Sequence, residues 1–183
     1  SSAASDVYKR QSLDIAAVNM SLGGGYYSSA CDSRAPAIAS VIDRLTSAGI
    51  AVVIAAGNSG MNGYISYPAC IRNAIAVGSS NKNDGLSGFS NHSTLIDLVA
   101  PGERITAGVP TRSIKAMSGT SMAAPHVAGA FALLRSYDPN ASVASLWTAL
   151  TCTGEPIVRA GVSRNRIDVR GAFQFLKNGL SSC

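Results

Sequence analysis

A serine at the start of an apolar run is the strongest chemical feature of this 183-residue chain. Ser121 follows Gly-Thr and precedes Met-Ala-Ala-Pro-His-Val-Ala-Gly, a run of small residues that predicts a helix. The free N–H groups and positive dipole end of a helix stabilise an anion, so Ser121 is a candidate nucleophile. Pro125 is expected in the first turn, where a missing N–H costs least. The alternative is a serine that only caps a core helix.

A second candidate group is the side-chain amide of Asn58. The apolar run Val52–Ala56 predicts a strand buried on both faces, and it ends in Gly57-Asn58. An asparagine there can donate a hydrogen bond to the oxyanion of a tetrahedral intermediate. The alternative is an asparagine that simply takes the turn after the strand. Another apolar segment runs into Gly23-Gly24-Gly25, whose spacing does not fit a dinucleotide-binding motif.

The elements that position these residues alternate along the chain. Strands are expected at 15–20, 51–56, 74–79 and 96–100, and helices at 35–48, 142–151 and 170–177. A further helix carries Ser121 and runs to about 136, and a hairpin at 105–117 turns near 110–112. This alternation predicts an α/β fold, a parallel β-sheet flanked by helices on both faces. Ser121, Asn58 and Gly23 then gather at the carboxyl ends of strands.

The string Gly119–Gly129 resembles the serine motif of the subtilisin-like serine proteases. Ser87–Pro101 resembles the family's Phe-Ser segment followed by Asp-x-x-Ala-Pro, and Tyr67–Ala69 resembles the segment after its oxyanion strand. The resemblance extends from about Ile15 to about Phe175 in the family's order. It implies a monomeric serine endopeptidase that acts on protein or peptide substrates and requires no cofactor.

The resemblance also implies a role for each matching residue. Ser121 attacks the scissile carbonyl, and the Asn58 side chain with the Ser121 N–H stabilises the oxyanion. Other residues pair with the substrate backbone or shape the pocket for the side chain before the cut, where the absence of a carboxylate favours apolar or aromatic side chains. These substrate-binding residues are Ser21, Leu22, Gly23, Gly24, Ala55, Ala56, Gly57, Ser66, Gly119 and Thr120.

The general base and its carboxylate partner have no counterpart among these residues. In the family they occur upstream, in Asp-[Ser/Thr]-Gly and His-Gly-Thr motifs, and neither motif is present. His126 is expected about 140° around the helix and about 7.5 Å along it from Ser121, so it has a structural role. His92 is expected in an exposed polar turn. We therefore predict that residues 12–183 form an N-terminally truncated domain, the C-terminal portion of a subtilisin-like peptidase. Its catalytic Asp and His are expected in upstream sequence. The alternatives are a non-catalytic peptide-binding domain and an inactive fragment.

The first eleven residues lack both helix or strand periodicity and the apolar core of a signal peptide. Asp6–Gln11 resembles adaptor read-through, which would make 1–11 non-native, and the alternative is an ordinary flexible terminus.

Four cysteines allow three pairings, and their spacing does not suit zinc. Cys31 and Cys70 lie in loops expected at one edge of the sheet, which favours a bridge between them; Cys152 and Cys183 then pair by elimination. Two disulfides indicate a secreted, extracellular protein, and the alternative is four buried thiols in a cytosolic one.

The composition suits one compact domain, with 46% hydrophobic and 14% charged residues. The net charge is +5, but the basic residues are scattered and lack interleaved aromatic residues, which excludes nucleic acid as the expected partner. The longest apolar run, Ile50–Ala56, is too short to cross a membrane.

A structural cation is a further implication of the resemblance. Related proteases bind calcium or sodium through carbonyl oxygens in the segment that matches Pro68–Ala74, sometimes with a carboxylate that matches Asp97. Ala69, Ile71 and Asp97 are therefore candidate ligands for an optional calcium or sodium ion. The alternative is that Asp97 only accepts hydrogen bonds from backbone N–H groups.

Overall fold

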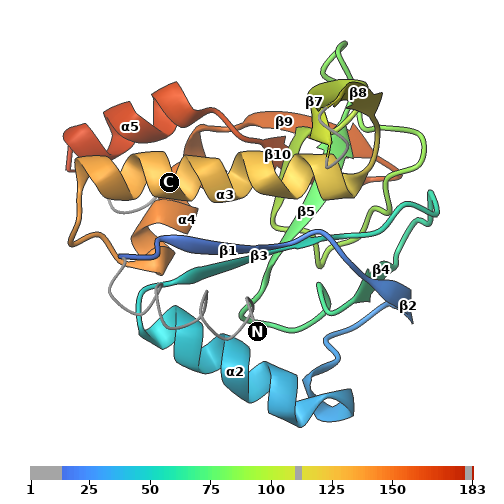
Figure 1. The fold of residues 1–183 in the computed structure, drawn as a ribbon, viewed down its shortest axis with the longest axis horizontal. Helices are drawn as coiled ribbons and strands as arrows, with labels where there is room; N and C mark the ends of the chain where they lie inside the picture. Colours follow the sequence, from blue (N-terminus) through green and yellow to red (C-terminus); the bar gives the residue numbers. More distant parts are fainter. Residues whose placement is uncertain (1–13, 110–112, 180–182) are drawn as a thin grey trace.

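The computed structural model describes residues 14–109, 113–179 and 183. The expectation for residues 1–11 therefore lies outside the described residues. The main sheet of the described part has the strand order β1-β3-β5-β6-β10-β9 (Figure 1). From β1 to β10 neighbouring strands run parallel, and β9 is antiparallel to β10. The strands are β1 (Ala17–Met20), β3 (Ala51–Ala55), β5 (Ile75–Ser80), β6 (Leu98–Pro101), β10 (Val162–Arg166) and β9 (Glu155–Arg159).

Helices cover both faces of this sheet, as the alternation of elements predicts (Figure 1). Helix α2 (Pro36–Ser47) lies on one face, and α3 (Thr120–Tyr137) with α4 (Val143–Thr153) and α5 (Val169–Lys177) lies on the other. A short 3-10 helix, η1 (Asp32–Arg34), precedes α2. The α/β fold class and all four predicted α-helices are confirmed, with ends shifted by one or two residues.

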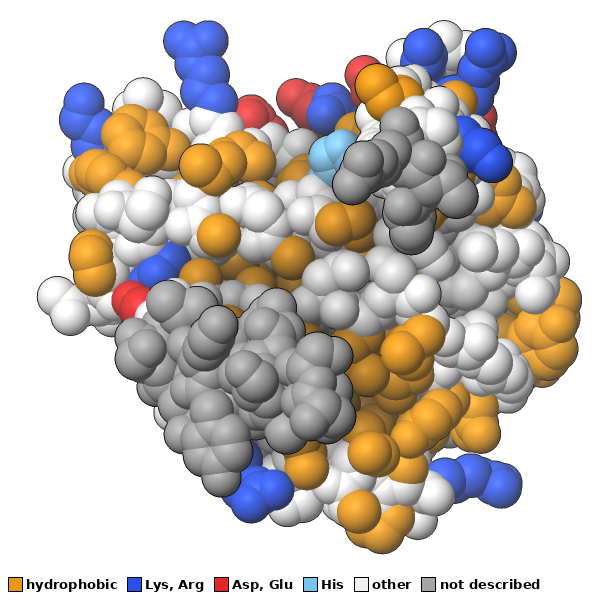
Figure 2. Space-filling view, in the orientation of Figure 1, with side chains coloured by type: hydrophobic (Ala, Val, Ile, Leu, Met, Phe, Trp, Pro, Cys, Tyr) orange, Lys and Arg blue, Asp and Glu red, His pale blue; other side chains and the backbone are white. Residues whose placement is uncertain are grey.

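Apolar side chains remain exposed on the outer surface of these helices. Hydrophobic side chains lie over α3 on the face drawn in Figure 2, and others gather toward α2. Leu133 and Tyr137 of α3 are 62% and 46% exposed. None of the helices in the described part of the chain is long and apolar enough to span a bilayer.

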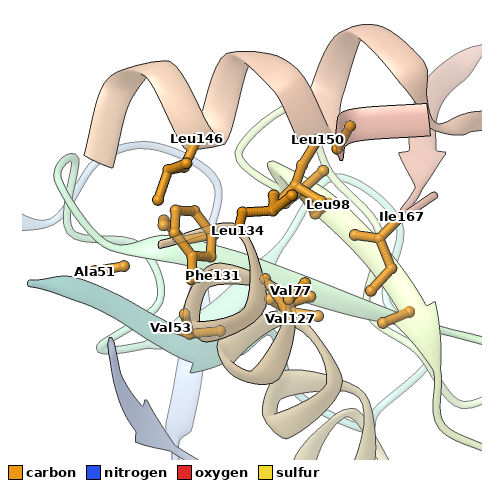
Figure 3. Close-up of a cluster of buried hydrophobic side chains, with 14 of the residues drawn as sticks. Ala51, Val53, Val77, Leu98, Val127, Phe131, Leu134, Leu146, Leu150 and Ile167 are labelled. Atoms are coloured by element: carbon orange, nitrogen blue, oxygen red, sulfur yellow. The ribbon is translucent and has the colours of Figure 1, made fainter. Parts of the chain in front are cut away.

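Strand β3 lies at the centre of the fold and is buried along its whole length. Successive side chains in a strand point to opposite faces, so Val53 packs toward α3 and contributes to a cluster with Val127 and Phe131 (Figure 3). Val52 and Ile54 point the other way, into the cluster that contains Ile42 of α2. Each fully buried Val, Ile or Phe side chain contributes about 1.5–3 kcal/mol to stability, which explains why this run has no polar residue.

Two small antiparallel pairs lie outside the main sheet. Strands β7 (Ile105–Val109) and β8 (Ser113–Met117) form the hairpin that the sequence predicts, and its turn at 110–112 lies outside the described residues. Strands β2 (Gly24–Tyr27) and β4 (Ile65–Tyr67) pair near the carboxyl ends of β1 and β3. Neither β2 nor β4 is predicted from the sequence, because strands of four and three residues are too short to show a periodicity.

The β9–β10 hairpin is also absent from the sequence prediction, which expects no element between 151 and 170. Ala160 and Gly161 connect the strands, with positive φ angles of 48° and 76°. Positive φ at both central positions is the geometry of a type I′ hairpin turn, whose twist matches that of paired strands. The Ala-Gly pair carries this signal only weakly, because alanine seldom takes a positive φ.

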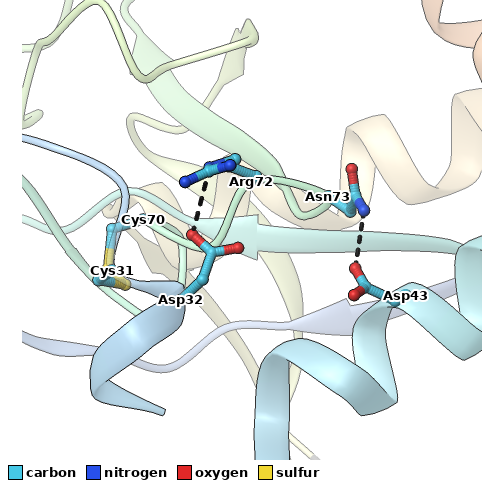
Figure 4. A network of polar contacts seen from close by, with 6 residues as sticks. All are labelled: Cys31, Asp32, Asp43, Cys70, Arg72 and Asn73. Carbon is cyan, nitrogen blue, oxygen red and sulfur yellow. Dashed lines mark hydrogen bonds and ion pairs between the residues drawn. A yellow bond between two sulfur atoms is a disulfide. The ribbon is translucent and has the colours of Figure 1, made fainter. Parts of the chain in front are cut away.

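Disulfides join Cys31 to Cys70 and Cys152 to Cys183, the pairing that the loop positions favour. Cys31 and Cys70 are buried, and the Cys31 N–H donates to the Cys70 carbonyl. Figure 4 shows polar contacts between the same segments: the Asn73 amide donates to Asp43 at 2.7 Å, and Arg72 lies 3.7 Å from Asp32. The segment after β4 is therefore fastened to the start and the middle of the η1–α2 region.

Replacing both Cys31 and Cys70 with alanine should lower the free energy of unfolding by about 3–4 kcal/mol, because the bridge closes a loop in the unfolded chain. Chemical denaturation of the variant and the parent measures this difference. Non-reducing peptide mapping provides the independent check, and it contradicts the pairing if either cysteine is free or is joined to Cys152 or Cys183.

Candidate active site

The turn that follows β3 brings Asn58 to the carboxyl edge of the sheet. Gly57 has a φ of 106°, and a Cβ atom there would lie 2.3 Å from Ser66 Oγ and 2.4 Å from Asn91 Nδ2. Only glycine fits both this backbone conformation and this space. The Gly57-Asn58 pair is therefore fixed by the backbone and by its neighbours.

Thr120, the first residue of α3, fixes the side chain of Asn58. Its N–H and its hydroxyl both donate to Asn58 Oδ1, at 2.8 and 2.9 Å, and its Oγ1 accepts from the Gly57 N–H at 3.1 Å. Since Oδ1 is the acceptor in both bonds, the amide orientation is set and Nδ2 is the atom left to donate elsewhere. Nδ2 would lie 3.3 Å from a Cβ on Gly119, so this donor is directly beside the residues that precede Ser121.

Ser121 occupies the first turn of α3 and contacts the segment after β1. Its hydroxyl lies 3.5 Å from the Ser21 carbonyl oxygen, and the Ser21 hydroxyl donates to the Ser121 carbonyl at 2.7 Å. The structure thus brings together Ser21, Asn58, Thr120 and Ser121, although a hundred residues separate the first from the last.

The expectation for Pro125 is wrong. Pro125 is the sixth residue of α3, in its second turn. A residue in this position would normally donate its N–H to the Ser121 carbonyl, and proline has no N–H. The Ser21 hydroxyl satisfies that carbonyl instead. The proline therefore frees the acceptor through which Ser21 holds the candidate nucleophile in place.

Neither histidine of the chain is placed to act as a base for Ser121. The His126 ring donates through Nδ1 to the Met122 carbonyl at 2.8 Å, within its own helix. The expectation that His92 is exposed is wrong: it is 1% exposed, and its Nε2 lies 3.0 Å from the Val162 carbonyl. Its polar neighbours suggest a surface turn, but the β9–β10 hairpin covers them.

The other predicted substrate-binding residues lie in two different environments. Ser21, Leu22, Gly23 and Gly24 are exposed, with Leu22 at 55%; Ser21 contacts Ser121, and Gly24 pairs with Tyr67 at the start of β2. Ala55 and Ala56 are buried within the sheet, and Ser66 is buried against Gly57. The exposed stretch can pair with an extended peptide, whereas the buried residues can only support the wall behind it.

An apolar pocket lies beside Ser121, and it was not predicted from the sequence. Its volume is about 260 Å³, and α3 and the β7–β8 hairpin form its walls. The predicted hairpin at 105–117 was the available signal, but the sequence does not show that it folds back onto α3. The pocket is lined by Ile105, Ala107, Met117, Ser121, Met122, Pro125 and His126.

The three candidate cation ligands, Ala69, Ile71 and Asp97, line one cavity of about 200 Å³. Asp97 Oδ2 accepts from the Ala76 N–H at 2.8 Å, so this carboxylate has the backbone role that was the alternative. Burial raises the pKa of Asp97 to about 6, although the Ala76 N–H, the Trp147 side chain and the Arg164 charge act in the opposite direction. One carboxylate with backbone carbonyls is a donor set that suits a hard cation. No cluster of three or more His, Cys, Asp or Glu side chains placed to bind metal occurs within the described residues.

A serine at a helix start beside a fixed amide at a strand end is the arrangement that the resemblance to subtilisin-like proteases implies. Residues 1–166 match the profile of the Subtilase family, Peptidase_S8. The chain belongs to the subtilase family of serine proteases, as its serine motif indicates.

Named relatives agree with this assignment. The Major intracellular serine protease of Bacillus subtilis is 43% identical over 132 residues, which are 70% of this chain and 39% of the relative. Subtilisin Savinase of Lederbergia lenta is 40% identical over 122 residues, 67% of this chain and 42% of the relative. The chain thus spans about two fifths of the length of these relatives.

Solved structures show the same fold. A cold adapted subtilisin-like serine proteinase matches with a TM-score of 0.73 and 31% identity, over 88% of this chain and 57% of that one. The self-cleaved protease domain of PatA matches with a TM-score of 0.80 and 25% identity, over 97% of this chain and 68% of that one. The subtilisin-like fold class is confirmed.

The raised pKa of Asp97 predicts a pH dependence of stability. The folded protein binds this proton more tightly than the unfolded chain, whose carboxyl has a pKa of 3.8. The free energy of unfolding therefore includes the full contribution of the protonated Asp97 carboxyl below pH 3.8. This contribution is lost as pH rises to about 6, a decrease of about 3 kcal/mol. Urea denaturation across this pH range, in the presence of a chelator, should show that the free energy of unfolding of the parent falls relative to that of Asp97→Asn. Parallel pH profiles for the two proteins would contradict it.

Proposed function

We propose that this chain supplies the nucleophile and the oxyanion hole of a serine endopeptidase. The observation that carries the proposal is the pair of hydrogen bonds from Thr120 to Asn58 Oδ1, because they leave Asn58 Nδ2 as a fixed donor beside Ser121. A donor fixed in advance stabilises charge without reorganising during the reaction, and removing one such donor raises the barrier by about 2.7–4 kcal/mol.

In this mechanism the Ser121 hydroxyl attacks the carbonyl carbon of the scissile peptide bond, and a base receives its proton. The developing oxyanion accepts hydrogen bonds from Asn58 Nδ2 and the Ser121 N–H. The substrate backbone lies along Ser21–Gly24 as an added strand, where exposed glycines allow close approach. Apolar walls without a carboxylate favour an apolar or aromatic side chain before the cut.

The base and its carboxylate partner come from protein outside this chain. Helix α3 is apolar on nearly every side, including the exposed Leu133, and a helix of this kind is normally buried all round. Strand β1 is the parallel edge of the described sheet, and parallel sheets are normally covered. The relatives are more than twice as long as the matched segment, so we assign both surfaces to the N-terminal portion of a complete protease domain.

A non-catalytic peptide-binding domain is the second candidate. One observation favours it: Ser121 Oγ lies 3.5 Å from the Ser21 carbonyl oxygen, and both imidazoles are engaged elsewhere. The oriented Asn58 amide favours catalysis, because binding a peptide backbone does not need a donor aimed at an oxyanion.

A calcium or sodium ion in the Ala69–Asp97 cavity completes the proposal. Asp97 and the carbonyls of Ala69 and Ile71 would hold it, and it would neutralise a buried carboxylate. If the ion binds there, adding calcium above pH 6 should remove the difference in stability between the parent and Asp97→Asn.

The two disulfides favour a secreted protein, because oxidising compartments preserve them, although one relative is named an intracellular protease.

The 183-residue chain alone should have no measurable peptidase activity, whereas a complete domain with the upstream portion should cleave peptides and react with a fluorophosphonate at Ser121. Removing one member of a catalytic triad lowers turnover by several orders of magnitude. Peptide hydrolysis and intact-mass measurement after labelling test both statements. Ser121→Ala is the control, and cleavage that persists in this variant refutes the proposed nucleophile.

In the complete domain Asn58→Leu should lower kcat by about 10²–10³ and leave KM nearly unchanged, because the lost donor meets charge present only in the transition state. Leucine has a similar volume and keeps the site filled. Steady-state kinetics separate the two parameters. A raised KM with an unchanged kcat would make Asn58 a binding residue instead.

A further inference from the structure

Asn91 is a fully buried polar residue whose side-chain amide and backbone N–H make their hydrogen bonds to the segment that carries Asn58. Within the described residues its Oδ1 accepts from the Ser59 and Met61 N–H groups at 3.1 and 3.2 Å. Its Nδ2 donates to the Ala56 carbonyl at 3.1 Å, and its own N–H donates to the Gly57 carbonyl at 3.0 Å. These partners lie on both sides of Asn58 in the sequence.

The shape of the loop matches this side chain closely. An amide oxygen has two acceptor positions, and Ser59 and Met61 use both, while the NH₂ group supplies the donor that the Ala56 carbonyl needs. The absent Cβ of Gly57 makes the room, since a Cβ there would lie 2.4 Å from Asn91 Nδ2. An aspartate in this place has the acceptors but lacks the donor.

Asn91 is in turn connected to the main sheet through its neighbours Ser90 and His92. The Ser90 hydroxyl donates to the Asn91 carbonyl at 3.0 Å and accepts from the Ser79 N–H of β5 at 3.0 Å. The next residue, His92, contacts the Val162 carbonyl of the β9–β10 hairpin. The loop around Asn58 is therefore fastened through Asn91 to the main sheet.

We infer that Asn91 is the positioning residue of the oxyanion hole, because it fixes the backbone before and after Asn58 while Thr120 fixes the rotation of the Asn58 amide. This inference rests on the proposed function. Asn91 does not touch the substrate and acts only through Asn58. Displacing a catalytic group by about 1 Å can lower a rate about 10²-fold, so loosening the loop affects turnover and leaves substrate binding intact.

The test uses a complete, active protease domain that contains this chain. Asn91→Ala should lower kcat by about ten- to a hundredfold with KM changed less than about twofold. Asn91→Asp, which keeps the volume and the acceptors but loses the donor, should lower kcat in the same way to a smaller extent. If both variants lose their folded structure, or if KM changes in place of kcat, the inference is overturned.

A double-mutant cycle separates positioning from general support of the fold. If Asn91 acts through Asn58, Asn91→Ala should change kcat by less than about twofold once Asn58→Leu is present, because groups acting as a unit are not additive. A purely structural role predicts the same fold-change in both backgrounds, and that result overturns the inference.

Asn81 offers a matched control away from the site. Its side chain also accepts from two backbone N–H groups, those of Asn83 and Gly85, at 2.9 and 3.1 Å. Asn81→Ala should lower stability but leave kcat within about twofold, since its turn does not touch Asn58. Activity that does not depend on Ser121 refutes the proposed function itself, whereas a Ser121-dependent enzyme unaffected by Asn91→Ala refutes only the role of Asn91.

Discussion

The hydrogen bonds between Thr120 and the Gly57-Asn58 turn are the contact on which the candidate site depends. Thr120 begins a helix and Asn58 ends a strand, so the bonds join two elements that are 62 residues apart. They also leave one amide hydrogen-bond donor fixed beside the serine. The contact sets the relative position of a helix start, which stabilises an anion, and of an amide that could otherwise turn either way.

Burial on both faces makes that contact stable. Strand β3 is covered by α3 on one side and by the α2 cluster on the other, so the turn at its carboxyl end starts from a rigid base. Asn91 and Ser21 add further contacts that stabilise the site: Asn91 donates to the Ala56 carbonyl, and Ser21 donates to the Ser121 carbonyl, which Pro125 leaves without its helical partner. The site is thus held by hydrogen bonds to backbone groups, and the bond from Asn91 to the Ala56 carbonyl is buried and therefore costly to break.

Particular residues show where prediction from the sequence succeeds and where it fails. The run Val52–Ala56 and the serine motif are local patterns, and both the elements and the family that they indicate are confirmed. His92 is wrongly expected at the surface, because its burial depends on a hairpin seventy residues away. Pro125 is wrongly placed in the first turn, because the compensating hydroxyl comes from a residue far away in the sequence.

The α/β class, the central buried strand, the helix that carries Ser121 and the subtilase family all follow from the amino-acid sequence, because each depends on residues close together in the chain. The orientation of the Asn58 amide, the partner of the Ser121 carbonyl, the apolar pocket and the hydrogen bonds of Asn91 can be seen only in the folded structure. These features arise where segments remote in sequence meet, and a hydrogen bond depends on the distance and angle between two atoms, which residue order does not specify.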